Sequence, residues 1–486
     1  MEYVIDLAPG VIHTNEGIFE TVKVLCSGDY QFDVTNIPHR MHVRTFRSGC
    51  DLEHFTNELR LHLLQARLSN GYYGDKKRWG FSYNELQRVN KTTFIKSIVP
   101  VKGMSAMGYY EEEQDYWEIQ YTHSFIAQNI SGWIEREYPE YEVYNCFDNV
   151  ITSFQALTGI GSFDKVPRGT SKYVSYNQFT YEKAKNGQGI FGIYRSLTLD
   201  IEVPAKKYTD EDTKNAVHPI SCIGCLFVNE KDELTRRIFY FGPFLENSTI
   251  EDKRYEDEYT MLCEFNKWVI ATDPQFIYGY NSNTYDIPYI FGRFRKLNID
   301  YSKWSKVDRC FPVLKEYDKD GMTLMNVECP GRIFVDILPL VRTKLKLPMY
   351  TLDAVARDQG LGCKDDIKHS QLYEYYYEGG VVKRDMVLAY CMQDVALTWK
   401  LAKKLKIFVQ LISTCRLMRV RCSDSMIRGR TFLIFQYIYA NFKDRYFFPN
   451  EHPNRYLNTV KGLPFYIAQN EAGEKYEGAY VLDPTF

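Results

Sequence analysis

The order of apolar and polar positions predicts alternating strands and helices over the second half of the chain. Short apolar runs between polar residues predict strands at 193–203, 219–228, near 237–241, at 275–280 and at 333–337. Apolar residues at near-helical spacing predict helices at about 251–271, 351–358 and 383–408. A hairpin with its turn at 318–321 is expected before the last strand. This order favours an α/β (α+β) fold in which helices flank a mixed sheet.

Residues 1–185 show a different pattern, in which short β-like runs alternate with polar turns. The clear helix in this part, about 51–66, begins at Asp51, a capping residue type, and carries apolar residues such as Phe55 and Leu59. We predict a mainly β N-terminal domain without a catalytic cluster. The polar, glycine-rich stretch 183–192 predicts a boundary to a second domain at 186–408.

The boundary stretch contains Gly187-Gln188-Gly189-Ile190-Phe191-Gly192, which matches the dinucleotide-binding fingerprint. In that fingerprint the glycines join a strand to a following helix, whereas here they precede a strand. We therefore interpret them as a linker. Beyond the second domain, residues 409–470 are expected to form a helical connecting segment, and 471–486 begin a further β run.

Composition limits the class of protein. The 486 residues are 45% hydrophobic and 25% charged, which is typical of a folded protein with room for two or three domains. A net charge of -2 gives no general attraction for nucleic acid, so such contacts would need local basic surface. The chain start lacks a secretory signal and no apolar stretch reaches membrane-spanning length, so an intracellular protein with reduced cysteines is expected. The CxxC pair Cys222 and Cys225 lies in a buried-strand pattern, which favours a structural role.

The most informative polar residues are acids that fall in three short motifs. Asp200 and Glu202 are two apart on a predicted strand, so their side chains point to the same face. Burying two carboxylates in this apolar setting is costly unless cations compensate them, and an exposed strand face is the alternative. Asp286 follows the end of another strand, where a helix cap is the alternative role. Tyr390 and Asp394 are one helical turn apart, and a surface pair would explain them equally well in isolation.

Together, the ordered motifs predict a hydrolytic metal site. Four converging acids would hold two divalent cations about 3.5 to 4 Å apart, one activating a water and the other neutralising the leaving 3′ oxygen. Mg²⁺ suits an all-oxygen site, and Mn²⁺ is a possible substitute. A phenol with an ordinary pKa near 10 stays mostly protonated at neutral pH, so Tyr390 would orient the water rather than act as a strong base.

The three motifs resemble the exonuclease motifs of family B DNA polymerases, within the DEDDy group of 3′→5′ exonucleases that share an RNase H-like fold. The order here is Asp200-Ile201-Glu202, then Tyr280-Asn281 with Tyr285-Asp286, then Tyr390 with Asp394. The segments 331–338 and 350–356 are similar to the stretch that those polymerases carry between the second and third motifs. Tyr476-Glu477-Gly478-Ala479 resembles the YxGG/A linker between exonuclease and palm.

The resemblance implies a role for each site residue. Asp200 would bridge both metals, Glu202 and Asp394 would complete the water-activating site, and Asp286 would hold the second metal largely through water. Asn281 and Tyr285 would contact the terminal nucleotide, and a Tyr in place of the usual Phe can still stack on a base. Further DNA contacts are expected from Tyr476, Gly478, Arg428 and Arg430, although a solvated helix face would equally explain the arginines.

The polymerase motifs of that family, Asp-x-x-Ser-Leu-Tyr-Pro and Tyr-x-Asp-Thr-Asp, are not in the sequence. We hypothesise that the chain is the N-terminal and exonuclease portion of a longer replicative polymerase, truncated before the palm, that removes mispaired 3′ ends. The resemblance implies DNA and a processivity factor as partners, no membrane, and action in the nucleus (the host nucleus if viral), with a cytoplasmic replication site also possible. The alternatives are a stand-alone DEDDy nuclease, against which the Tyr476 linker argues, and an inactive nucleic-acid-binding scaffold, against which the four acids argue.

Overall fold

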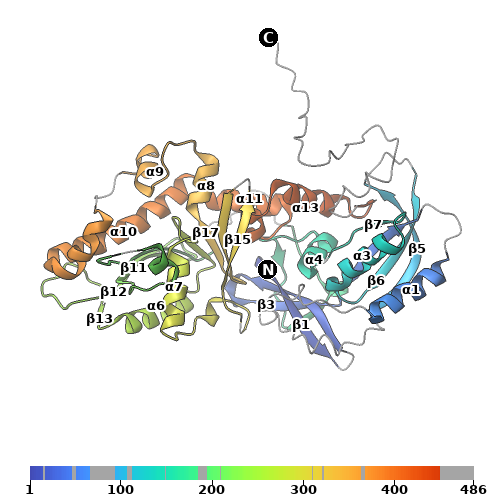
Figure 1. Ribbon diagram of the computed structural model, residues 1–486, viewed down its shortest axis with the longest axis horizontal. Helices are drawn as coiled ribbons and strands as arrows, with labels where there is room; N and C mark the ends of the chain where they lie inside the picture. Colours follow the sequence, from blue (N-terminus) through green and yellow to red (C-terminus); the bar gives the residue numbers. More distant parts are fainter. Residues whose placement is uncertain are drawn as a thin grey trace, which may run out of the picture. The chain divides into compact units, whose positions relative to one another are not determined.

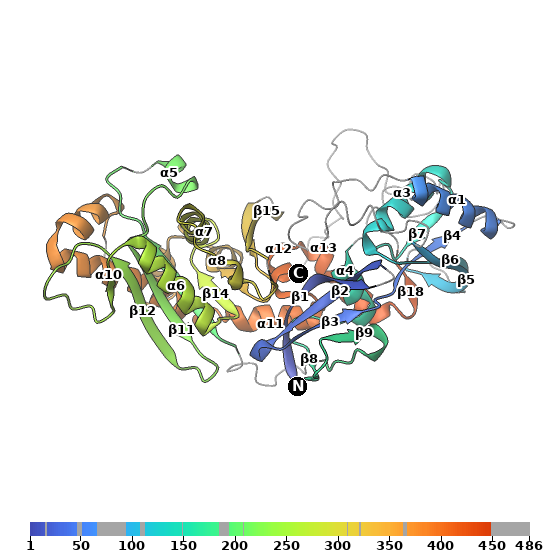
Figure 2. The same ribbon diagram turned by 90° about the horizontal axis from the view of Figure 1, so that it is seen from below.

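The computed structural model describes residues 1–14, 17–45, 51–65, 94–106, 112–147, 149–183, 194–207, 209–308, 310–319, 322–362 and 367–448. The chain divides into two compact units (Figures 1 and 2). The first contains Met1–Ile37 and Val150–Asn441, and the second contains Pro38–Leu68, Asn90–Asn149 and the segment from Phe442. Among the described helices, none combines the length and the apolar character that a membrane span requires.

A six-stranded mixed sheet forms the centre of the first unit. Its order is β13-β12-β11-β10-β14-β17, with antiparallel pairing between β10, β11 and β12 and parallel pairing of β14 with β10 and β17. The strands are β10 (Ser196–Glu202), β11 (Cys222–Val228), β12 (Leu234–Phe241), β13 (Arg254–Tyr255), β14 (Phe276–Gly279) and β17 (Ile333–Asp336). A separate hairpin is formed by β15 (Val313–Lys319) and β16 (Met322–Glu328).

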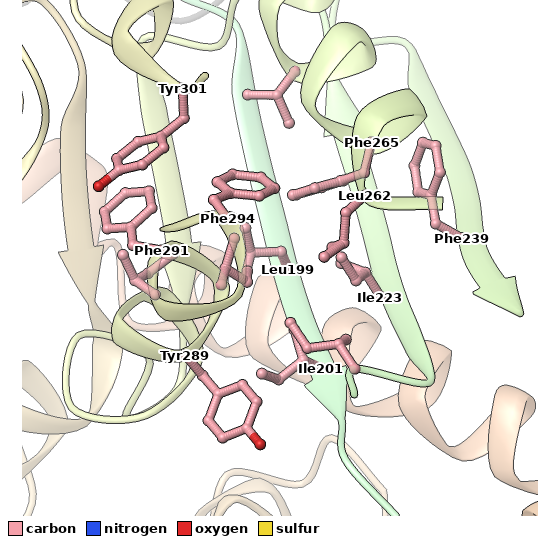
Figure 3. Close-up of a cluster of buried hydrophobic side chains, with 14 of the residues drawn as sticks. Leu199, Ile201, Ile223, Phe239, Leu262, Phe265, Tyr289, Phe291, Phe294 and Tyr301 are labelled. Atoms are coloured by element: carbon pink, nitrogen blue, oxygen red, sulfur yellow. The ribbon is translucent and has the colours of Figure 1, made fainter. Parts of the chain in front are cut away.

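Helices cover both faces of this sheet, because its central strands carry apolar side chains on both faces. On one face, Leu199 and Ile201 of β10 pack with α6 (Glu258–Thr272) and α7 (Asp286–Lys296), as Figure 3 shows. On the other face, β14 and β17 pack with α9 (Leu352–Asp358), α10 (Gly380–Lys404) and α11 (Ile407–Met418). Among the residues that the structure describes, this unit also contains α4 (Val150–Thr158), α5 (Asp210–Lys214), α8 (Ile337–Lys344), α12 (Cys422–Ile427) and α13 (Arg430–Phe442).

A second sheet in the same unit begins at the N-terminus. Its order is β8-β1-β2-β3-β9, and its strands are β1 (Glu2–Thr14), β2 (Gly17–Cys26), β3 (Gln31–Thr35), β8 (Lys165–Val166) and β9 (Tyr173–Ser175). Distant segments hold β1 in place. The N–H of Gly331, which has a φ of 80°, donates to Asp6 Oδ2 at 3.2 Å, and Arg421 Nη1 donates to the carbonyl of Leu7 at 3.4 Å. The N-terminal strands therefore fold with residues more than three hundred positions away.

The second unit is a smaller sheet with helices on one face. Its elements are β4 (His39–Arg44), α1 (Leu52–Gln65), β5 (Ile95–Ser105), β6 (Gln114–Tyr121), α3 (Ala127–Glu137), β7 (Glu142–Tyr144) and β18 (Tyr446–Phe447). The order of the first six is the split β-α-β arrangement, and the sheet order is β18-β5-β6-β4-β7. Aromatic packing between the helices and the sheet centres on Phe55, whose ring lies 4.9 Å from that of Trp117 and 5.6 Å from that of Trp133.

Most predicted elements are present with changed ends. The helix predicted at 251–271 was wrong at its start, because Arg254–Tyr255 pair with β12 and the side chain of Asp257 caps the helix from Glu258. The helix predicted at 383–408 ends at Lys404, since Lys406 adopts a left-handed conformation and a new helix follows. The helix at 51–66 is confirmed as α1, and Asp51 Oδ1 accepts the N–H groups of residues 53 and 54.

Other predictions are confirmed or lie outside the described residues. The hairpin is confirmed by the last pair of β15 and β16, Lys319 with Met322, while its turn at 320–321 is outside the described residues. The buried strand with the CxxC pair is β11, where Cys222 and Cys225 enter cores on opposite faces. The linker glycines at 187–192 and the segment 449–486, with Tyr476 and Gly478, lie outside the described part of the chain.

Candidate active site

The first two acids lie at the end of β10 and face α10. Since Leu199 and Ile201 are buried toward α6 and α7, the alternating positions Asp200 and Glu202 point to the opposite face. Their carboxylate oxygens and the Sγ of Cys391, on α10, all lie within 4.8 Å of one another. The Cys391 thiol also lies 3.6 Å from the carbonyl oxygen of Asp200.

A glycine on the neighbouring strand allows α10 to come this close. Gly224 of β11 is the cross-strand partner of Asp200. A Cβ at Gly224 would lie 2.9 Å from the Sγ of Cys391 and 3.0 Å from Cγ2 of Val395, closer than van der Waals contact permits. The absence of a side chain at Gly224 therefore brings the third motif against the first.

The third acid is buried at the start of α7. Oδ1 of Asp286 accepts the backbone N–H of Ile201 at 3.1 Å, so the carboxylate lies against the strand between Asp200 and Glu202. Burial, together with the negative charges of Asp336 and Asp394, raises the pKa of Asp286 to about 7. This carboxylate is thus held where its ionised form is unfavourable without a nearby cation.

The loop that leads to Asp286 is held by an acid on the adjacent strand. A side chain on Gly279, at the end of β14, would overlap Ser282, so glycine permits the tight turn. Asp336, at the end of β17, accepts the N–H of Asn281 at 2.9 Å and that of Asn283 at 3.2 Å. It also caps α8 through the N–H of Leu338 at 3.0 Å, yet burial raises its pKa to about 6.

The last predicted residues lie one turn apart on α10. Asp394 is buried and Tyr390 is half-buried. Asp394 is close enough to Asp286 for its charge to raise the pKa of that group. The structure therefore brings Asp200 and Glu202 close to each other and holds Asp286 against the same strand. Asp394, on α10, lies near enough to Asp286 for the two charges to interact.

Two residues of this region were missed by sequence reasoning. Cys391 follows Tyr390 in the third motif, and its approach to Asp200 depends on helix-sheet packing that no local pattern encodes. The pKa of the Cys391 thiol is raised well above its ordinary value. The main cause is a hydrogen bond with Cys222, and burial is the second cause. Asp336 had a usable signal, since an acid that directly follows a buried strand and precedes a helix is a common cap.

The predicted DNA-contact residues are distributed differently. Asn281 is exposed with a φ of 61°, and the half-buried ring of Tyr285 lies 5.8 Å from that of Tyr289. Arg428 and Arg430 are exposed where α12 meets α13.

The arginines upstream of this pair have structural partners. Arg416 is buried, Arg419 pairs with Asp164 at 3.1 Å, and Arg421 pairs with Asp424 at 2.8 Å. Arg428 and Arg430 are the arginines of this region whose side chains are exposed.

Comparisons with known proteins agree with this geometry. A sequence model described as "DNA polymerase family B, exonuclease domain" matches residues 144–355. The DNA polymerase delta catalytic subunit of Drosophila melanogaster is 23% identical over 319 residues, which cover 64% of this chain and 28% of that protein. The DNA polymerase catalytic subunit of elephantid herpesvirus 1 is 28% identical over 302 residues, covering 60% of this chain and 27% of that protein.

A solved structure shows the same fold over most of the chain. The family B DNA polymerase of Pyrobaculum calidifontis matches with a TM-score of 0.63 at 15% identity, over 91% of this chain and 50% of that one. The chain spans about a quarter of the length of these two curated relatives. The mixed sheet with its flanking helices is RNase H-like, and residues 144–355 are similar to the exonuclease domain of the family B DNA polymerases.

Proposed function

We propose that this chain is a 3′→5′ exonuclease that hydrolyses DNA from its 3′ end with two divalent cations. Asp200, Glu202, Asp286 and Asp394 are the proposed metal ligands, and Tyr390 is proposed to orient the attacking water. In the reaction, a water oxygen bonds to the terminal phosphorus and the bond to the preceding 3′ oxygen breaks. That oxygen takes up a proton, and a 5′-mononucleotide is released.

The buried carboxylate of Asp286 is the observation that carries this proposal. Asp286 accepts the backbone N–H of Ile201, which lies between Asp200 and Glu202 on β10. Burial raises the pKa of Asp286 to about 7, and the charges of Asp336 and Asp394 contribute to that shift. An acid cluster of this kind is costly to fold unless a cation compensates it. An inactive scaffold that binds no metal would bear the cost of burying these carboxylates without a compensating cation.

The donor chemistry fits Mg²⁺, with Mn²⁺ as a substitute. The converging ligands are carboxylate oxygens, which hard divalent cations prefer. The nearby Cys391 thiol has a raised pKa and so stays protonated, and a protonated thiol is a poor ligand. When bound, two such cations would activate a water and neutralise charge on the leaving oxygen.

The remaining residues position the substrate. Asp336 accepts the N–H groups of Asn281 and Asn283, and these hydrogen bonds hold the loop that carries Asn281 and leads to Tyr285. The Tyr285 ring offers a face on which a base can stack. Because a mispaired end is cheaper to unstack than a paired one, the site would favour errors without reading sequence.

The relatives support a proposed role for this activity in DNA replication. Since they are polymerase catalytic subunits, we propose that hydrolysis proofreads ends made by template-directed synthesis. DNA is the proposed substrate, a processivity factor the proposed partner and the nucleus the proposed location. Arg428, Arg430, Tyr476 and Gly478 are retained as proposed DNA contacts.

The test is degradation of labelled single-stranded DNA by the full chain. With Mg²⁺, a 5′-labelled strand should shorten stepwise, and a 3′-terminal label should be released at once as a mononucleotide. Replacing Mg²⁺ by EDTA should stop the reaction. Asp200→Ala combined with Glu202→Ala should reduce the rate about a thousandfold or more, since metal ligation contributes several kcal/mol.

The matched control is Asp232→Ala, an exposed acid on the turn between β11 and β12. It should leave the rate unchanged. Undiminished degradation by the double variant would refute the site, and failure of the unaltered chain to degrade DNA with Mg²⁺ or Mn²⁺ would refute the function.

A further inference from the structure

A cavity lies beside the acid cluster and is not used by the mechanism above. Its volume is about 510 Å³, and it is lined by the loop 204–207, by His218 and Pro219, and by Tyr373 and Tyr377. The loop follows Glu202 directly in the chain. A cavity of this size is in the range that binds small organic ligands.

The walls of the cavity are fixed to the elements that hold the acids. Ser221 donates its N–H to the carbonyl of Glu202 at 2.9 Å, and its Oγ shares a hydrogen bond of 2.7 Å with the Tyr377 hydroxyl. On the other side, the Tyr289 hydroxyl donates to the carbonyl of His218 at 2.8 Å, and Tyr289 is three residues after Asp286 on α7. The cavity is therefore positioned by the strand and the helix that carry Glu202 and Asp286.

The lining combines positive charge with aromatic rings. Lys206 Nζ lies 4.9 Å from the centre of the Tyr373 ring and 2.9 Å from a carboxylate oxygen of Glu378. The rings of Tyr373 and Tyr377 lie 5.1 Å apart at 41°. Lys207 is exposed and forms no ion pair with any described residue. Ammonium groups bind phosphate, and phenol rings stack on bases.

We propose that this cavity binds a nucleotide, with its phosphate on Lys206 and Lys207 and its base against Tyr373 and Tyr377. This rests on the proposed function, because a site next to the acids would receive the mononucleotide that hydrolysis releases or a nucleotide of the strand being degraded. Glu378 acts against binding, since its carboxylate competes with the phosphate for Lys206.

The first experiment measures binding of dAMP to the full chain in EDTA by equilibrium dialysis, with deoxyadenosine as the ligand that lacks phosphate. Lys206→Gln combined with Lys207→Gln should weaken dAMP binding about tenfold, as expected for lost charge-assisted hydrogen bonds. Deoxyadenosine binding should change little. The control Lys231→Gln, on the turn between β11 and β12 at the opposite end of β10 from Glu202, should leave both unchanged.

A variant that binds dAMP more tightly is a useful test, because damage to the fold would weaken binding. Glu378→Gln removes the competing carboxylate from Lys206 and should strengthen dAMP binding a few fold. Tyr373→Leu should weaken dAMP and deoxyadenosine alike, whereas Tyr373→Phe should preserve both. Unchanged dAMP binding in the double lysine variant, or weaker binding in Glu378→Gln, would overturn the proposal.

Assays of DNA degradation in Mg²⁺ distinguish the two sources of the nucleotide. They also distinguish failure of this proposal from failure of the proposed function. If the site takes the released product, the lysine variant loses inhibition by added dAMP while the KM for a labelled oligonucleotide is unchanged. If it takes part of the strand, that KM rises instead. If the unaltered chain degrades no DNA but dAMP binding in EDTA still depends on the lysines, the cavity stands and the nuclease assignment falls.

Discussion

Two buried acids in different units of the molecule have opposite electrostatic surroundings. Glu118, on β6, accepts hydrogen bonds from His42 at 3.2 Å and Gln120 at 2.7 Å and lies 3.5 Å from Arg40. The His42 hydrogen bond above all lowers the pKa of Glu118 to about 2. Asp286 accepts the N–H of Ile201 but lies near the carboxylates of Asp336 and Asp394, and burial above all raises its pKa to about 7.

The groups around Glu118 are one cation, Arg40, and two side chains that are neutral near pH 7, those of His42 and Gln120. Burial lowers the pKa of His42, so its ring is neutral near pH 7. Its Nε2–H then donates to Glu118, and Asn145 Nδ2 donates to its Nδ1 at 3.1 Å. Glu118 is thus surrounded by groups that favour its charged form, whereas burial and neighbouring carboxylates disfavour the charged form of Asp286, a proposed metal ligand.

The largest effect that tests this comparison is expected for Asp286→Asn. The rate of DNA degradation should fall about a hundredfold or more, because a metal ligand is lost. In EDTA at pH 8, the free energy of unfolding should rise, because a buried charge is removed. Enzyme assays and urea denaturation measure the two changes. A variant that is both active and less stable would break the comparison.

The packing that brings the acids together is tested by Gly224→Ala. The added methyl group meets Cys391 and Val395, so a loss of roughly 1 to 3 kcal/mol in unfolding free energy is expected, together with slower hydrolysis. Gly132→Ala on α3, where a Cβ meets nothing within 4 Å, is the matched control. It should be neutral or slightly stabilising, since alanine favours helices.

The pH dependence of stability distinguishes the two acids. The pKa of Asp286 is raised in the folded state, so the folded protein binds more protons than the unfolded one between about pH 4 and 7. In EDTA, stability from this group should therefore fall as pH rises through that range, by an amount on the order of 2 kcal/mol. Mg²⁺ should reverse the loss at pH 8. The difference between the unaltered chain and Asp286→Asn isolates the effect, and equal slopes would contradict it.

The smallest effect is expected for Glu118→Gln. Because the pKa of Glu118 is lowered, its contribution to stability is present above the ordinary glutamate range and is lost as pH falls toward about 2. The substitution should cost about 1 kcal/mol at pH 7 and leave DNA degradation unchanged. Denaturation at pH 7 and pH 3 should show a smaller difference at the lower pH. A large loss of nuclease rate would show that the two units are coupled.

The sequence could predict those parts of the site that depend on local periodicity. Alternation along 193–203 predicts that Asp200 and Glu202 share a face, and helical spacing predicts the same for Tyr390 and Asp394. The meeting of these elements depends on contacts between residues far apart, such as Gly224 with Cys391. No local pattern carries that information.

The errors in element boundaries have a similar cause. The apolar spacing of 251–271 continues through Arg254 and Tyr255, but strand pairing with β12 takes those residues out of the helix. Asp257 then supplies the cap that the pattern alone did not distinguish. Tertiary pairing overrides local preference at such positions.

The anchoring of β1 affects how the protein can be made. Ribosomes release the N-terminal strands first, yet Asp6 meets the N–H of Gly331 and Leu7 meets Arg421. Until those distant residues emerge, the nascent β1 cannot complete its contacts and leaves an open strand edge. Chaperone protection of the first forty residues during translation would thus be a condition for a good yield of folded chain.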